Sequence, residues 1–350
     1  MSSRASQDVT VRQGGDLRGL PDADRLLDLS TCANRYGPPP AVAAALRSAD
    51  PARLLPHPYQ AEELFVTAYA DYLDVPAADL VAGRGITDFL TMFARTLPRH
   101  RVAVLTPDYT DTMRLFGHHL PAPADTIDTA EGRLARLADA MRRYDHLVLS
   151  NPNNPLGIHI PPDELAAVCR ARPRSTLIVD EAYADFTAEG TNGSMVRTCV
   201  RNLVVLLSPN KLFGIAGTRT GALWTHDARL RAMVAAQRVN WPISHLDALV
   251  AHAALHSAAW AAETRTRLLR TARRMETLLS DRYPGAVTGV PVHFRFVHTG
   301  DPVSAHADLL RAGVVVRAFA GRKAGSRSGL RVTAPTEAEF PALAAALGMR

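Results

Sequence analysis

Short apolar runs, each ending in a polar or turn-forming residue, recur along the middle of the chain. They lie at residues 80–83, 101–106, 146–150, 175–180 and 204–207. Runs of this length are typical of buried strands. Segments with helical apolar spacing occur before and between them, for example at 61–73 and 162–171. Strands that alternate with helices in this way predict an α/β fold.

The pattern changes toward the C-terminus. Residues 246–279 are rich in alanine and predict one or two helices. The segments VHFRFVH, GVVVRAF and LRVTA follow, and their apolar positions alternate with a period of two, which is typical of strands. We therefore expect a small α+β domain at this end of the chain.

Composition places the chain among ordinary globular proteins. Its 350 residues are 47% hydrophobic and 21% charged. No apolar run approaches the roughly 18 residues that span a membrane, and the first residues lack the apolar core of a secretory signal, so we expect a cytoplasmic protein. The net charge of +6 comes from single arginines scattered over helical stretches, which argues against nucleic-acid binding.

Cysteine and histidine positions predict neither disulfides nor a metal site. Cys32, Cys169 and Cys199 are widely spaced and form no CxxC pair, so we expect reduced thiols. His252 and His256 are four residues apart, but neither a third ligand nor the glutamate of HExxH accompanies them. We therefore predict no metal.

Lysine is rare in this chain, and one lysine follows a predicted strand. Of the 40 Lys and Arg residues, only Lys211 and Lys323 are lysine. Unlike arginine, which stays charged with a pKa above about 12, lysine can lose its proton and form an imine with an aldehyde. Lys323 lies in GRKAGSRSG, a composition typical of a solvated loop. Lys211 is therefore the candidate for covalent chemistry; a leftover surface charge is the alternative.

The segment around Lys211, SPNKLFGIAGTRTG, resembles the Schiff-base lysine segment of fold-type-I pyridoxal-phosphate (PLP) enzymes, in particular histidinol-phosphate aminotransferases and threonine-phosphate decarboxylases. In that family a Ser or Thr precedes the lysine by three residues, and an Arg eight residues after it binds the cofactor phosphate. Ser208 and Arg219 stand at these positions. A guanidinium suits a phosphate dianion, and Gly214 and Gly217 let the backbone turn tightly between the two.

A second segment, LVAGRGITDFL, resembles the turn that holds the PLP phosphate. A Gly-x-Gly turn before a helix offers backbone N–H groups to an anion, and the resemblance implies this role for Arg84, Gly85 and Ile86. Relatives also carry a Tyr-Pro whose Tyr reaches the neighbouring subunit's phosphate. His57 stands in its place and is a further implied contact; an ordinary loop histidine is the alternative.

Three more segments resemble those that hold the cofactor ring. Tyr109 in TPDY matches the aromatic residue that stacks on the pyridine. Asn154 in NPNNPLG matches the residue that hydrogen-bonds the phenolic oxygen. Asp180 and Tyr183 in DEAY match the aspartate that keeps the pyridine nitrogen protonated and the tyrosine that hydrogen-bonds the phenolic oxygen. Without the resemblance, packing, turn and cap roles are the alternatives.

Substrate-binding residues are implied at both ends of the chain. The opening ANRYGPPP resembles the family segment that lines the substrate cleft, with Asn34 and Tyr36 at the matching positions. Arg331 in GLRVT matches the arginine that binds the substrate α-carboxylate, and Arg317 in GVVVRAF matches a position that can hold a substrate phosphate. The sequence departs from the family pattern at four positions, Cys32, Arg35, His57 and Leu156. These departures raise the hypothesis of a substrate other than histidinol phosphate.

The resemblance extends from about residue 28 to the end and implies a fold-type-I PLP transferase: a large domain with a mostly parallel sheet, and a small α+β domain. Residues 1–45 would form an arm and part of the small domain, residues 46–259 the large PLP-binding domain, and residues 260–350 the rest of the small domain. The family also implies a homodimer whose subunits share their active sites.

The predicted function is a PLP-dependent aminotransferase that acts on an amino acid or amine with a second anionic group. Lys211 would form the Schiff base and then act as acid or base at the substrate Cα, with Asp180 holding the ring protonated. The same residues would serve a decarboxylase of the threonine-phosphate type, which the segments RQGGDLR and DLST also resemble. A catalytically silent PLP-fold protein that binds a partner is a third alternative.

Overall fold

The structure is a computed structural model that describes residues 16–20, 22–123, 127–321 and 327–349. Lys323 and the first residues of the predicted arm lie outside the described residues. The chain divides into two compact units: Ala33–Leu269 with Val290–Val292, and Met1–Cys32 with Arg270–Gly289 and His293–Arg350. From the sequence, the boundaries between the two domains are predicted at residues 45/46 and 259/260.

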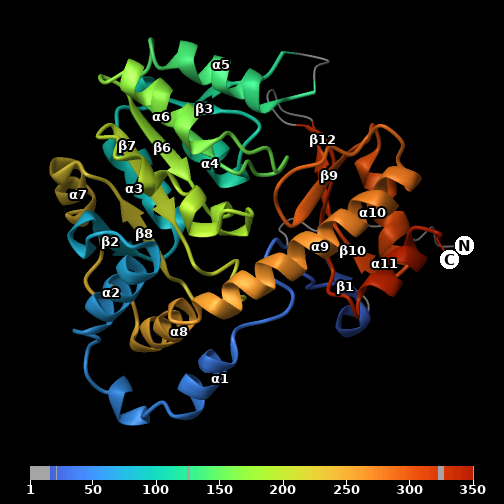
Figure 1. Ribbon diagram of the computed structural model, residues 1–350, viewed down its shortest axis with the longest axis horizontal. Coiled ribbons are helices and arrows are strands. Elements are labelled where there is room, and N and C mark those ends of the chain that lie inside the picture. Colours follow the sequence, from blue (N-terminus) through green and yellow to red (C-terminus); the bar gives the residue numbers. More distant parts are fainter. Residues whose placement is uncertain (1–15, 21, 124–126, 322–326, 350) are drawn as a thin grey trace, which may run out of the picture. The chain divides into compact units, whose positions relative to one another are not determined.

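The larger unit contains a seven-stranded sheet in the order β2-β8-β7-β6-β5-β3-β4 (Figure 1). The strands are β2 (Leu80–Gly83), β3 (Val102–Leu105), β4 (His118–Leu120), β5 (His146–Ser150), β6 (Thr176–Asp180), β7 (Leu203–Leu207) and β8 (Gly221–Trp224). β8 runs antiparallel to both of its neighbours, and the other pairs are parallel. The predicted α/β fold with a mostly parallel sheet is confirmed.

Helices precede, connect and follow these strands along the chain. They are α1 (Pro40–Arg47), α2 (Ala61–Leu73), α3 (Ile86–Thr96), α4 (Thr110–Leu115), α5 (Ala130–Ala140), α6 (Pro162–Ala171), α7 (Ala228–Ala235), α8 (His245–Leu255) and α9 (Ala258–Arg282). The alanine-rich region predicted as one or two helices forms α8 and α9. Within the described ranges, no helix is both long and apolar enough to cross a membrane.

The core of the larger unit explains why the apolar runs become strands. Every residue of β2, β3, β7 and β8 is buried, as expected for strands covered on both faces. α3 is amphipathic and directs Phe89, Leu90 and Phe93 into a cluster that includes Val104 and Leu206 of the sheet. This packing fixes the strand ends, where the predicted site residues stand.

The smaller unit is built on a three-stranded antiparallel sheet in the order β11-β12-β9. Its strands are β9 (Phe294–His298), β11 (Arg317–Ala320) and β12 (Ser328–Thr333), and β1 (Leu27–Asp28) pairs in parallel with β10 (Val314–Val315). Helices α10 (Pro302–Arg311) and α11 (Phe340–Ala346) belong to the same unit. This is the predicted α+β domain.

Four parallel strands of the large sheet end at one edge. Asp180 is the last residue of β6, and the segments that follow β3, β5, β6 and β7 carry Tyr109, Asn154, Tyr183 and Lys211. Ligands of open α/β sheets bind outside the carboxyl ends of the strands. The topology therefore gathers these predicted residues at one edge of the sheet.

Candidate active site

Lys211 lies in a loop that is hydrogen-bonded to the N-terminal segment of the larger unit. The Asn34 N–H donates to the Lys211 carbonyl at 2.8 Å, and the Asn34 amide Nδ2 donates to the carbonyls of Leu212 (2.9 Å) and Gly37 (3.2 Å). Asn34 Oδ1 accepts the Tyr36 N–H at 2.8 Å. Asn34 is 5% exposed, so its side chain is committed to this backbone. Its predicted contact with substrate remains a prediction.

A close contact between two glycines, Gly214 and Gly37, also restrains this loop. Gly214 has a φ of +62°, and a Cβ there would lie 2.6 Å from the carbonyl of Gly37. Only glycine fits both the conformation and the space. Beside this contact, the Arg267 guanidinium lies 4.0 Å from the centre of the Tyr36 ring, which is cation–π distance. Tyr36 is thus held by the Asn34 side chain through its backbone and by Arg267 of α9 through its ring.

The predicted phosphate turn is a close-packed cradle. Gly85, with a φ of +87°, precedes the first turn of α3, and among the described residues no side chain caps that helix. The Arg219 Nη2 lies 3.5 Å from the Arg84 carbonyl and would be 3.1 Å from a Cβ at Gly85. A Cβ at Gly221 would lie 2.6 Å from the Gly85 Cα. Two glycines and an arginine therefore lie around the N–H groups of a helix start, which favours an anion.

Hydrogen bonds hold the two segments that form this cradle, the turn at Arg84 and the segment around Arg219. The Asp88 carboxylate accepts the Arg84 N–H at 3.0 Å, and Asp247 accepts the Arg219 N–H at 3.1 Å. Ser208 Oγ donates to the Thr220 carbonyl at 3.2 Å, which ties the loop before Lys211 to the start of β8. The predicted phosphate ligands Arg84, Gly85, Ile86 and Arg219 are therefore close together.

Asp180 ends β6 as a buried carboxylate. It is 5% exposed, and its Oδ1 accepts the Ala182 N–H at 2.9 Å. Burial raises the pKa of Asp180 to about 7, with the charge of Asp108 acting in the same direction; the Ala182 N–H and the Lys211 ammonium act to lower it. Asp180 and Lys211 thus interact electrostatically, and a cationic partner would favour the ionised carboxylate.

The remaining ring residues lie on neighbouring strand ends. Tyr109 is half-buried, and its hydroxyl donates to Asp111 at 2.8 Å; burial raises the pKa of this phenol to about 12. The Asn154 N–H donates to Ser150 Oγ at 2.9 Å. Tyr183 is buried three residues after Asp180. The roles that the resemblance gives these three side chains remain predictions.

These features suit PLP in both charge and shape. The glycine cradle offers helix N–H groups and Arg219 to a phosphate, and the buried Asp180 offers an acceptor to a protonated ring nitrogen. Lys211, which interacts with Asp180, supplies the amine. The residues present therefore fit the cofactor.

The two predicted substrate arginines occur in the smaller unit. Arg317 on β11 lies directly opposite Arg331 on β12. Arg331 is 7% exposed, and its Nη2 donates to the Ser30 carbonyl at 3.2 Å. Opposite residues of an antiparallel pair direct their side chains to the same face, where like charges repel. An anion between the two guanidinium groups would relieve that repulsion.

His57 lies in an exposed aromatic cluster of the larger unit. Its ring stacks on Trp241, with centroids 4.0 Å apart and planes at 9°, and Tyr59 meets the Trp241 ring edge-on at 5.9 Å. Tyr59 is 72% exposed and Trp241 43% exposed. The predicted contact of His57 with a neighbouring subunit's cofactor stays a prediction.

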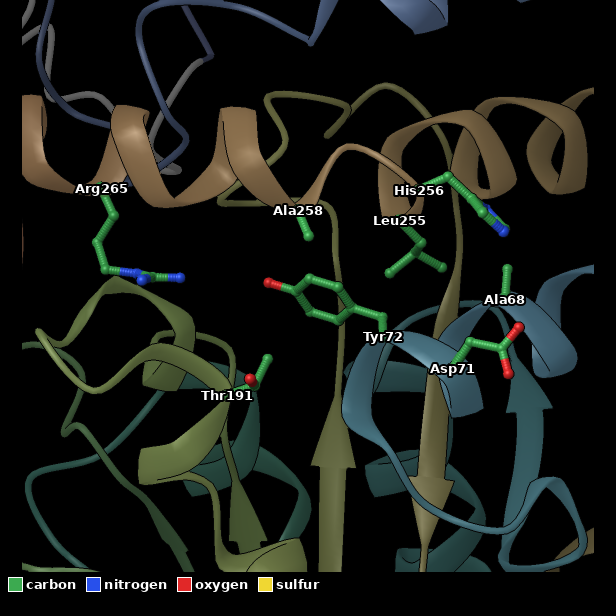
Figure 2. Close-up of a pocket in the computed structure, with 8 residues that line it drawn as sticks. All are labelled: Ala68, Asp71, Tyr72, Thr191, Leu255, His256, Ala258 and Arg265. Atoms are coloured by element: carbon green, nitrogen blue, oxygen red, sulfur yellow. The ribbon is translucent and has the colours of Figure 1, made fainter.

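A separate cavity of about 340 Å³ lies in the larger unit, between α2, the ends of α8 and α9, and the segment around Thr191. Figure 2 shows the Tyr72 ring within it and the Tyr72 hydroxyl directed toward Arg265. The predicted site residues do not appear in its described lining, which consists of Ala68, Asp71, Tyr72, Thr191, Leu255, His256, Ala258 and Arg265. This cavity is therefore distinct from the candidate active site.

Sequence reasoning missed several residues that support the site. Asp108 and Ser150 connect the turns that carry Tyr109 and Asn154, and Gly221 fits against Gly85. Asp108 immediately precedes Tyr109, and Gly221 follows Arg219 by two residues, so adjacency was the available signal. Their partners are distant in sequence, and no local pattern identifies such contacts.

Comparison with known proteins agrees with this geometry. The family model described as "Aminotransferase class I and II" matches residues 24–347. Histidinol-phosphate aminotransferase 1 of Bradyrhizobium diazoefficiens is 32% identical over 333 residues, which cover 91% of this chain and 90% of that relative. Histidinol-phosphate aminotransferase of Gluconacetobacter diazotrophicus is 31% identical and covers 94% of this chain and 92% of its own length.

Solved structures share the fold. A histidinol-phosphate aminotransferase from Clostridium acetobutylicum superposes with a TM-score of 0.80 at 18% identity, covering 92% of this chain and 98% of that one. An L-threonine-O-3-phosphate decarboxylase from Porphyromonas gingivalis gives 0.75 at 20% identity, covering 91% and 98%. The fold-type-I architecture is therefore common to both reactions, and fold likeness does not choose between them. The family model and the two named relatives support amino transfer, and the chain belongs to the class I and II aminotransferases, with PLP as its cofactor.

Proposed function

We propose that this aminotransferase exchanges an amino group between an amino acid and a substrate that carries a second anionic group, with histidinol phosphate as the first candidate. The observation that carries the proposal is the arginine pair of the smaller unit. Arg317 and Arg331 are direct cross-strand neighbours whose guanidinium groups both lie beside the Phe319 ring, and two neighbouring guanidinium groups are suited to bind one anion. The relatives named above act on a phosphate ester, which fits this chemistry.

In this proposal each residue of the larger unit has one task. Arg219 and the backbone of Arg84, Gly85 and Ile86 bind the cofactor phosphate. The Asp180 carboxylate accepts a hydrogen bond from the protonated ring nitrogen and so keeps it protonated, while Tyr109, Asn154, Tyr183 and Ser208 orient the ring and its surroundings. PLP supplies the electron sink when it is bound. Lys211 holds the cofactor and moves a proton at the substrate Cα, because its amine, unlike a guanidinium, can exist in the neutral form that bonds an aldehyde and takes up a proton.

A substrate panel tests the proposal. The purified protein, loaded with PLP, is assayed with histidinol phosphate, histidinol and phosphate-free amino acids, each with a set of 2-oxo acids as acceptors. We expect amino transfer to depend on the acceptor and to favour the phosphorylated amine. Release of carbon dioxide without any need for an acceptor would instead identify the decarboxylase alternative, for which O-phosphothreonine is the probe.

Variants of the arginine pair sharpen the substrate assignment. Arg317→Gln should raise KM for a phosphorylated amine by about 10–100-fold, since a charge-assisted contact contributes roughly 1.5–3 kcal/mol. It should change KM for a substrate without that phosphate far less. Equal losses for both kinds of substrate would show that Arg317 does not recognise the second anion.

A homodimer is part of the same proposal. The cluster of His57, Tyr59 and Trp241 exposes aromatic area that a second copy of this chain would cover. The family resemblance places His57 at the position of a residue that reaches the neighbouring cofactor. Sedimentation of the wild type and of Trp241→Ser tests this surface. A dimeric wild type and a weakened variant are expected; an unchanged dimer in the variant would place the interface elsewhere.

A cytoplasmic location also belongs to the proposal. Cys32, Cys169 and Cys199 are free thiols, and Cys199 is exposed. Unpaired cysteines are usual where the compartment keeps thiols reduced. Fractionation of cells that express the protein would test this location directly.

A further inference from the structure

One buried carboxylate connects two of the turns that carry predicted cofactor contacts. Asp108 is 2% exposed and lies between β3 and α4. Its Oδ1 accepts the Tyr109 N–H at 2.8 Å, and its Oδ2 accepts both the N–H (2.8 Å) and the hydroxyl (2.9 Å) of Ser150 at the end of β5. Asp108 thus bonds to the backbone of two neighbouring strand ends.

Ser150 extends the connection to the next turn. Its Oγ accepts the N–H of Asn154 at 2.9 Å and a contact from Asn153 Nδ2 at 3.3 Å, and Asn153 also donates to the Pro107 carbonyl at 2.9 Å. A continuous hydrogen-bond chain therefore runs from the Tyr109 backbone through Asp108 and Ser150 to the Asn154 backbone. Such chains restrain the groups at their two ends relative to each other.

A buried arginine accompanies Asp108. Arg133 on α5 is 1% exposed, and its Nη2 lies 3.8 Å from Asp108 Oδ2. Its guanidinium also donates to the carbonyls of Leu105 and Pro107 at 3.3 Å, and it pairs with Asp128 at 3.0 Å. A charge buried this deeply is costly unless it is paired, and here it meets two carboxylates and the end of β3. Arg133 therefore supports the strand end from which Asp108 projects.

We propose that Asp108 is a positioning residue of the cofactor site, which sets the spacing between Tyr109 and Asn154 through its bonds to the Tyr109 N–H and to Ser150. Arg133 is its buried counter-ion. In this proposal Asp108 acts through Tyr109 and Ser150 and does not itself touch the cofactor or the substrate. The inference rests on the proposed roles of Tyr109 and Asn154 as ring contacts, and a purely structural ion pair is the competing explanation.

The chain offers a matched pair of variants for the test. Asp108→Asn and Asp128→Asn each remove one buried carboxylate beside Arg133, and only Asp108 also contacts the two turns. In Asp108→Asn, the amide NH₂ meets an N–H or hydroxyl donor on one side, so one of the two turns loses its acceptor. Asp128→Asn leaves both turns bonded. The measurements are the dissociation constant of PLP, the absorbance and circular dichroism of the bound cofactor, and the thermal midpoint.

We expect Asp108→Asn to weaken PLP binding about tenfold and to shift the spectrum of the bound cofactor. Asp128→Asn should lower the thermal midpoint and leave affinity and spectrum near those of the wild type. Equal effects of the two variants on affinity and spectrum, or none in Asp108→Asn, would overturn the inference. If Asp108→Asn does not fold, Ser150→Ala decides: a spectral shift with weaker PLP binding supports the positioning role, and wild-type values refute it. A wild type that binds no PLP would instead contradict the assigned cofactor.

Discussion

The two ends of the candidate site consist of different chemical groups. The predicted phosphate end consists of backbone and of glycines without side chains. A Cβ at Gly221 would lie 2.6 Å from the Gly85 Cα, and the Arg219 guanidinium lies beside the Arg84 carbonyl. At the ring end the chain uses buried carboxylates, Asp180 and Asp108, whose pKa values burial raises to about 7 and about 6. The first end is adapted to shape and the second to charge.

This difference predicts different failures. A methyl group added to the cradle should damage cofactor affinity through steric conflict, because its neighbours are backbone atoms that cannot rotate away. A charge removed from the ring end should leave the shape intact and change the electrostatics and the pH dependence. Lys211 interacts with Asp180 and is the proposed point of attachment of the cofactor, so its loss should affect both cofactor binding and the chemistry.

The largest effect is expected from Lys211→Ala. Without the amine, we expect amino transfer to fall by about 10³-fold or more and the absorbance of the lysine-bound cofactor to disappear. Lys211→Arg should lose as much, since a guanidinium keeps the charge but cannot supply a neutral nitrogen. Near-normal turnover in either variant would remove Lys211 from the mechanism.

Asp180→Asn tests the electrostatic end, with an expected loss of activity of about 10²–10³-fold. Its effect on stability has the opposite sign. Because the pKa of Asp180 is raised from 3.8 to about 7 in the folded protein, the folded state holds this proton more tightly than the unfolded chain. The cofactor-free wild type should therefore lose stability as pH rises from about 4 to about 7, and the full loss should persist above that range.

The Asn variant lacks this titration. Cofactor-free Asp180→Asn should be more stable than the wild type at pH 8, by on the order of 4 kcal/mol, and equal to it near pH 4. Asp108, Glu181 and Asp185 also have raised pKa values, and both proteins contain them. In addition to burial, the charge of Asp108 raises the pKa of Asp180, and the charge of Asp180 raises that of Glu181, so the difference between the two proteins reports Asp180 together with these couplings. Urea unfolding across this pH range measures the difference; parallel curves would contradict a raised pKa of Asp180 in the folded protein.

Gly221→Ala tests the steric end. The added Cβ would lie 2.6 Å from the Gly85 Cα, so one strand end must move. We expect PLP to bind about 10-fold more weakly, with a loss of about 1–3 kcal/mol in the free energy of unfolding. Gly217→Ala is the matched control, because no heavy atom lies within 4 Å of a Cβ at that position. Similar PLP affinities in the two variants would show that the cradle is looser than this contact implies.

The smallest effect on activity is expected from Asn34→Ala, which removes the hydrogen bonds to Gly37, Leu212 and Tyr36. Stability should fall by about 1–3 kcal/mol, with only a several-fold loss of turnover, because the main-chain bond to Lys211 survives. Asn34→Asp keeps the acceptor for the Tyr36 N–H and should recover part of the stability. A loss confined to substrate KM, with unchanged stability, would favour the predicted direct contact with substrate.

The sequence predicted the scaffold well because its signals are local. The runs at 146–150 and 204–207 form β5 and β7 near their predicted positions, and the helical spacings at 61–73 and 162–171 match α2 and α6. The fold class, enzyme class and cofactor followed from motifs that each occupy one short segment. Local periodicity and turn chemistry determine such elements, so one stretch of sequence is enough to identify them.

The supporting contacts were not predictable, for an equally physical reason. Asp108 was only a polar residue in a turn until the fold placed Ser150 and Arg133 beside it. Asn34 matched a substrate-binding position by resemblance, and no pattern around it indicates that its amide bonds to the Leu212 carbonyl. These pairings depend on which strands become neighbours, and a single sequence contains no signal for that.

The reversed direction of β8 has a consequence for how the protein acquires its cofactor. β8 pairs antiparallel with β2 so that Gly83 lies opposite Gly221, although the two strands are far apart along the chain. Contacts of such long sequence separation form late, after the loop-closure entropy of the intervening segment has been overcome. A nascent or partly folded chain therefore lacks the cradle, and the uptake of PLP during refolding should report completion of this edge of the sheet.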